Sequence, residues 1–122
     1  MKLAACIEDV KQEKPNSFGE TKLTSFINEL EAMVQEYLGI APENIIVYDW
    51  AENGNKELIV KAPYDAMYKS WLKAKIDYAN EEYYSYANNQ AQFVSEYEEW
   101  KAYAISSGQV EAKVPLRIKN WW

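Results

Sequence analysis

The 122-residue sequence contains no histidine and only one cysteine, Cys6. The absence of histidine excludes Ser-His-Asp and Cys-His catalysis and removes the commonest transition-metal ligand. A single cysteine excludes an intramolecular disulfide and a cysteine-based metal cluster, so we expect Cys6 to be a small buried hydrophobic residue near a helix start. We therefore expect no enzymatic activity, no cofactor and no bound metal.

Glycine and long apolar runs are also scarce. With only four glycines the chain has no Gly-x-Gly-x-x-Gly and no Gly-x4-Gly-Lys-Ser/Thr, so nucleotide binding is unsupported. No stretch approaches the roughly 18 to 20 apolar residues of a membrane helix, and Glu8 and Asp9 come too early for a signal peptide. We expect a soluble protein that is not secreted and has no membrane partner.

Aromatic residues and acids, in contrast, are plentiful. Five Trp and ten Tyr supply flat surfaces with a polar edge, which favours contact with protein partners. Residues 1–111 hold 19 acids against 10 lysines, a formal charge of −9, whereas residues 112–122 hold three bases and no acid. An acidic body argues against tight binding of nucleic acid.

Apolar spacing predicts a mainly α protein, a small helical bundle with one inserted β-hairpin and an extended C-terminal arm. Helical periods occur at about residues 2–11, 20–38, 63–86 and 90–105, and Ser17 with Glu20 has the capping-box pattern. A break at about Ala87 to Asn89 suggests two antiparallel helices rather than one rod. We assign residues 1–109 to the helical domain and 110–122 to the arm.

The hairpin is predicted at about residues 44–61, where the hydrophobic period changes from helix to strand. Ile45 to Trp50 and Glu57 to Val60 are rich in β-branched and aromatic residues, and Asn53-Gly54 between them is typical of a tight turn. Apolar side chains fall on both faces of this ribbon, and its own helices can cover only one. We therefore predict subunit contacts through Ile46, Val47, Tyr48 and Trp50.

The arm carries apolar residues beside its basic ones. Val114, Leu116 and Ile118 alternate with strand period, and Trp121 and Trp122 are costly to leave in water. We predict that a docking arm formed by these five residues and Arg117 binds a partner or a neighbouring subunit. The alternative is that the arm folds back on its own helices and completes the core.

Two other groups of side chains could carry chemistry. Acids such as Glu81-Glu82 and Glu96, Glu98 and Glu99 could form a catalytic pair, but such residues are far more often on solvated helix faces. The tyrosines at 78, 83, 84 and 86 could stack sugars or bases, although core or subunit contact fits the helical spacing of Tyr83 and Tyr86 better.

Several runs together resemble a family of small head-tail connector, or adaptor, proteins of long-tailed bacteriophages and prophages of Gram-positive bacteria. The likeness spans roughly residues 7–105, and the family usually has Gly where this chain has Glu81. The runs are Lys14-Pro15-Asn16-Ser17-Phe18, Glu20-Thr21-Lys22-Leu23, Asn28-Glu29-Leu30-Glu31, Ala62-Pro63-Tyr64-Asp65-Ala66-Met67-Tyr68, Trp71 to Tyr83, and Asn88-Asn89 with Phe93.

This resemblance implies a structural virion protein at the phage neck, assembled in the host cytoplasm. Its implied partners are copies of itself in a twelve-fold ring, the portal protein, a tail-side stopper or tail-completion protein, and double-stranded DNA passing without specific binding. Two alternatives remain: a small acidic binding or inhibitor protein acting on a basic protein surface, and a carbohydrate-binding module using Trp and Tyr.

Overall fold

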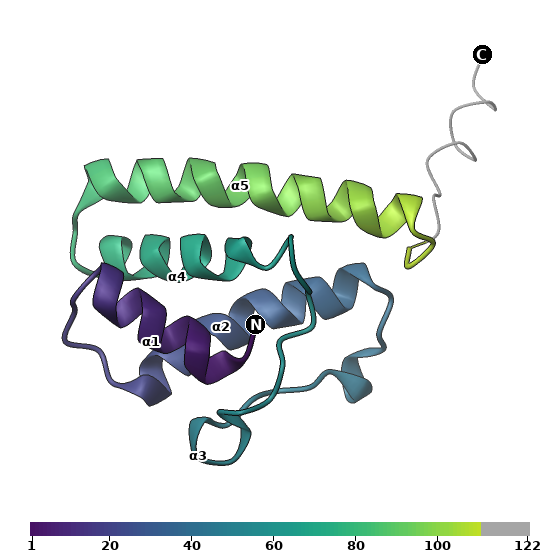
Figure 1. The fold of residues 1–122 in the computed structure, drawn as a ribbon, viewed down its shortest axis with the longest axis horizontal. Coiled ribbons are helices and arrows are strands. Elements are labelled where there is room, and N and C mark those ends of the chain that lie inside the picture. The colour runs from purple at the N-terminus through teal and green to yellow at the C-terminus, as the bar shows by residue number, and fades with distance from the viewer. Residues whose placement is uncertain (111–122) are drawn as a thin grey trace.

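The computed structural model describes residues 1–110, which form five α-helices and one short 3-10 helix (Figure 1). The helices are α1 (Leu3–Glu13), α2 (Glu20–Tyr37), α3 (Trp50–Asn53), α4 (Ala66–Ala79) and α5 (Tyr83–Ser106), with the 3-10 turn at Pro42–Asn44. The mainly α prediction is confirmed. No β-strand occurs within these residues, and the only strand-like pairing among them is an isolated antiparallel bridge between Lys2 and Glu57.

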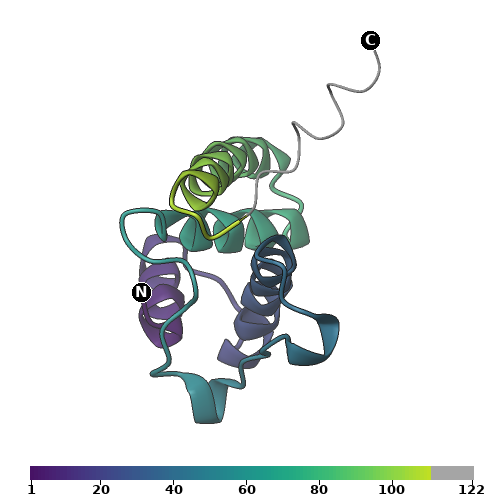
Figure 2. The same cartoon turned by 90° about the vertical axis from the view of Figure 1, so that its right-hand side faces the viewer.

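The helices are arranged in three layers (Figure 2). Helix α5 forms the outer layer, α4 lies beneath it, and α1 and α2 lie side by side below α4. Residues 40–55 run along the side of α1 and α2 that faces away from α5, and residues 56–65 then rise to the start of α4, where Tyr64 stacks on Tyr103 of α5. The central position of α4 explains why it buries residues on two sides, among them Met67, Leu72 and Ile76.

Helices α1 and α2 form where the apolar spacing predicts them. Cys6 is fully buried in α1, as expected, and Gly39 ends α2 with φ of 84°, a left-handed conformation that glycine adopts without strain. The predicted capping box at Ser17 is wrong: Gly19 holds the N-cap position of α2 and no side chain caps it. Asn16 organises this loop instead, by accepting a hydrogen bond from the Phe18 N–H at 2.9 Å.

Two antiparallel helices follow residue 63, as predicted, but the break lies elsewhere. The first helix begins at Ala66 and ends at Ala79, and α5 runs straight through Ala87 to Asn89. The turn is made at Glu81, whose φ of 59° is left-handed. Buried Asp77 secures this end, because it binds Lys14 Nζ at 2.6 Å and Asn89 Nδ2 at 2.8 Å.

The predicted β-hairpin at residues 44–61 is wrong. Asn53-Gly54 ends a capped helical turn: the Asp49 carboxylate accepts from the Glu52 N–H, and Asn53 Oδ1 accepts from the Asp49 N–H. Gly54 has φ of −54° in the right-handed helical region, so no tight turn of the primed type forms. The two would-be strands bind different partners: side chains of α2 hold residues 46 and 48, and the start of the chain holds residues 56 and 58, so no ladder forms between them.

Within residues 1–110 no helix combines the length and the apolar character that a bilayer-spanning segment needs. The predicted docking arm, apart from its first residue Val110, lies outside the described residues.

Candidate functional site

The candidate site is a stretch of extended backbone, Ile45 to Asp49, which we call the extended segment. Two side-chain amides of α2 bind its inner edge in the way a neighbouring strand would. Gln35 accepts from the Ile46 N–H at 2.8 Å and donates to the Ile46 carbonyl at 3.0 Å. Asn28 accepts from the Tyr48 N–H and donates to the Tyr48 carbonyl, both at 2.9 Å. Each amide thus replaces one backbone pair of a β-ladder.

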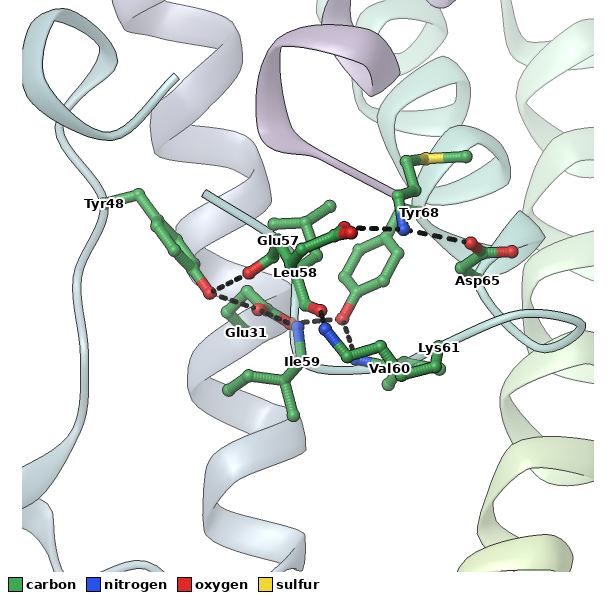
Figure 3. A network of polar contacts seen from close by, with 10 residues as sticks. Glu31, Tyr48, Glu57, Leu58, Ile59, Val60, Lys61, Asp65 and Tyr68 are labelled. Carbon is green, nitrogen blue, oxygen red and sulfur yellow. Dashed lines mark hydrogen bonds and ion pairs between the residues drawn. The ribbon is translucent and has the colours of Figure 1, made fainter. Parts of the chain in front are cut away.

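Glu31, one turn of α2 away from each amide, fixes the segment from below (Figure 3). One carboxylate oxygen accepts from the Tyr68 hydroxyl at 2.5 Å, and the other accepts from the Tyr48 hydroxyl at 3.1 Å and the Ile59 N–H at 3.0 Å. The Tyr68 hydroxyl in turn accepts from the Val60 N–H at 2.9 Å. One buried carboxylate therefore joins α2, the extended segment, residues 59–60 and α4.

Burial governs the protonation of this network. Removal from water raises the pKa of Glu31 above its ordinary range, although its three hydrogen-bond donors act in the opposite direction. Burial and the neighbouring Glu31 carboxylate likewise raise the pKa of Tyr48 and of Tyr68. Both phenols therefore keep their protons at neutral pH and can donate hydrogen bonds to the Glu31 carboxylate between them.

The second predicted strand pairs with the start of the chain. The Leu3 N–H donates to the Lys56 carbonyl at 3.0 Å, and the Leu58 N–H donates to the Met1 carbonyl at 2.9 Å. The Met1 amino group lies 3.2 Å from both the Glu57 and the Asp65 carboxylates (Figure 3). These contacts place residues 56–58 against α1 instead of against the extended segment.

The outer edge of the extended segment is open at Val47, since the Ile45 N–H donates to the Pro42 carbonyl and both amide groups of Asp49 bind Asn53. Because Ile46 and Tyr48 turn their amide groups toward α2, the amide groups of Val47 point the other way, and they make no hydrogen bond within residues 1–110. The Val47 side chain is 69% exposed and that of Ile46 is 54% exposed, whereas Tyr48 is buried. Trp50 is half-buried against the core. Of the four predicted contact residues, Ile46 and Val47 are thus available to a partner.

The predicted docking-arm residues Val114, Leu116, Arg117, Ile118, Trp121 and Trp122 lie outside the described residues. The described chain ends at Val110, whose N–H donates to the Ala104 carbonyl at the end of α5. Val110 also packs against the core, which fixes the point from which residues 111–122 depart.

A recess of about 320 Å³ lies between α4 and α5. Trp71, Tyr78 and Tyr86 line it, and the Lys75 ammonium lies 4.8 Å from the centre of the Trp71 ring. Tyr78 also packs against Tyr86, with 5.2 Å between ring centres. Tyr78 thus makes tilted or edge-on ring contacts with Tyr83 and Tyr86, whereas Tyr84 is 93% exposed.

The sequence analysis missed Asn28, Glu31 and Gln35. A signal was present: Glu31 lies four residues after Ile27 and three before Val34, in the middle of the apolar stripe of α2. A charged residue at such a position needs buried partners. Asn28 and Gln35 flank it seven residues apart, on nearly the same side of the helix.

No protein-family model, no curated protein and no solved structure matches this chain.

Proposed function

We propose that this chain is a structural subunit of a bacteriophage neck, forming a ring that joins the portal of the head to the tail-side proteins and lines the DNA channel. The proposal starts from the sequence likeness to head-tail connectors. The contacts that the residues of that likeness make in the fold support it.

The observation that carries the proposal is that four polar or aromatic residues of the most recognisable run, residues 62–83, are occupied by structural contacts. Asp65 binds the Met1 amino group, Tyr68 binds Glu31, and the Trp71 indole donates to the Phe26 carbonyl at 2.7 Å. Asp77 binds Lys14 and Asn89. A motif whose polar groups are used in this way specifies a fold rather than a reaction, which suits an assembly protein.

A second observation supports assembly. Ile46 and Val47 expose adjacent aliphatic side chains on backbone that α2 holds in one conformation. A contact surface that is already ordered loses little conformational entropy when a partner binds. Repetition around a closed ring would then add many such modest contacts into one stable assembly.

The charge of the surface fits a DNA channel. Glu81, Glu82, Glu98 and Glu99 are exposed on or beside α5, and residues 1–111 carry a formal charge of −9. Acidic walls repel the phosphate backbone, so DNA would pass without adhering.

Deleting the gene from the phage or prophage that encodes it tests this function. Electron microscopy of the lysate should show DNA-containing heads and separate, complete tails, and the wild-type gene supplied in trans should restore joined particles. A Ser95→Ala gene serves as a matched control, because Ser95 is exposed on α5 and its side chain makes no hydrogen bond within residues 1–110. Normal joined particles from the deletion strain would contradict the proposal.

A further inference from the structure

At Val47 the outer edge of the extended segment resembles the edge of a β-sheet, because the backbone N–H and carbonyl of this residue make no hydrogen bond within residues 1–110. The inner edge of the segment is satisfied by the amides of Asn28 and Gln35, whereas Val47 is exposed. Exposed edges of this kind accept an added strand, where backbone hydrogen bonds supply affinity. A partner therefore has to be an extended peptide with alternating apolar residues.

We propose, on the basis of the ring function above, that residues 111–122 of a neighbouring copy add to this edge as a strand. Residues 114, 116 and 118 of that segment are apolar and alternate with Pro115, Arg117 and Lys119. Proline has no N–H, so it is tolerated only on the unpaired side of an added strand. The backbone groups of the odd-numbered residues would then point away from the edge, and those of Leu116 would pair with Val47.

Charge supports the same occupant. The surface around the extended segment, residues 42–57, carries four exposed acids and one lysine: Glu43, Asp49, Glu52 and Glu57 against Lys56. The arriving segment brings Lys113, Arg117 and Lys119 and no acid beyond Glu111. Opposite charges orient such an encounter and disfavour contacts between two acidic bodies in other registers.

Chain length permits contact between copies. Twelve residues follow Val110, and an extended chain covers about 3.3 Å per residue, or about 40 Å in all. That reach is comparable to the diameter of a domain of this size. Since the edge and the arriving segment are different surfaces, the contact is head-to-tail, the type that closes into rings.

Disulfide formation between two singly substituted chains tests this pairing. A Val47→Cys chain is mixed with a Leu116→Cys chain under mild oxidation, because directly opposed strand residues have the Cα separation of a disulfide. A Val94→Cys chain, substituted at a 46% exposed valine of α5, replaces the first chain in the control. Cys6 does not compete, because burial removes it from solvent and raises its pKa to about 12.

The linked dimer of Val47→Cys with Leu116→Cys should form several times faster than the control dimer. Equal yields would overturn the proposal. So would a link that forms only within one chain carrying both substitutions, since residues 111–122 would then cover their own subunit.

A backbone substitution gives an independent readout. Val47→Pro removes the free N–H, while Val47→Ala removes the same side-chain contacts and keeps the N–H. Self-association, measured by sedimentation, should weaken about tenfold more for proline than for alanine, the factor that corresponds to one hydrogen bond. Equal weakening would count against strand addition. If the chain binds a portal as a ring yet fails both tests, only this inference fails; if no ring forms, the proposed function fails.

Discussion

Tyr68→Phe removes one oxygen atom from the centre of the molecule and leaves the side-chain volume almost unchanged. Tyr68 is fully buried, and its hydroxyl both donates to Glu31 and accepts from the Val60 N–H. The substitution therefore deletes a hydrogen bond to a carboxylate and leaves a buried N–H without a partner.

The expected cost follows from those two losses. A hydrogen bond to a charged group contributes about 1.5 to 3 kcal/mol, and an unsatisfied buried donor costs about 1 to 3 kcal/mol. Because both effects share one small region, we expect a combined loss of about 3 kcal/mol in the free energy of unfolding. That is a large part of the roughly 5 to 15 kcal/mol that stabilises a typical domain.

Two further Tyr→Phe substitutions make the experiment quantitative. Tyr48→Phe should cost about 1 to 2 kcal/mol, because Glu31 keeps its contacts with Tyr68 and Ile59. Tyr84→Phe, at a 93% exposed position, should change stability by less than about 0.5 kcal/mol. Urea denaturation followed by circular dichroism measures all three, and an equal effect of Tyr68→Phe and Tyr84→Phe would refute the Glu31 network.

Three other predictions concern charge and backbone strain. Because burial raises the pKa of Glu31 in the folded state, this carboxyl group stays protonated to a higher pH in the folded than in the unfolded chain. Wild-type stability should therefore fall relative to Glu31→Gln as pH rises from about 4 through the folded pKa. A constant difference between pH 4 and 9 would contradict this. Asp77 shifts the other way: burial opposes ionisation, but hydrogen bonds from Lys14, Ser85 and Asn89 prevail and lower its pKa. Its contribution should be present at neutral pH and lost below about pH 4, so Asp77→Asn should differ most from wild type at neutral pH in the same denaturation assay. Glu81→Gly should stabilise the protein by about 1 kcal/mol, because φ of 59° favours glycine, and an unchanged or lower melting temperature would argue against strain there.

The helices were predictable because their apolar spacing alone determines which faces are buried. Leu23, Ile27, Leu30 and Val34 all lie in the core at the positions that period 3.6 requires. The break after Ala79 was misplaced because Asn88 and Asn89 carry the usual composition of a helix end, whereas Glu81 adopts a conformation that its residue type disfavours.

The hairpin prediction failed because composition reports the conformation that a residue prefers and not the group that its backbone will bind. Ile46 and Tyr48 are extended, as β-branched and aromatic residues favour, but their amide groups bind the side chains of Gln35 and Asn28 on the preceding helix α2. The exposure of Ile46 and Val47 follows from that arrangement. Apolar residues on both sides of the segment were visible in the sequence, and two of the four predicted contact residues are indeed accessible.

The most direct test of the proposed connector function is the mass of a complex between this chain and a portal protein encoded by the same genome. Native mass spectrometry of the mixture should show a portal carrying a ring of 14.2 kDa subunits, twelve by the family likeness, and electron microscopy should place that ring at one end of the portal. A chain that stays monomeric beside the portal, or that binds one basic protein as a single copy, would contradict the account.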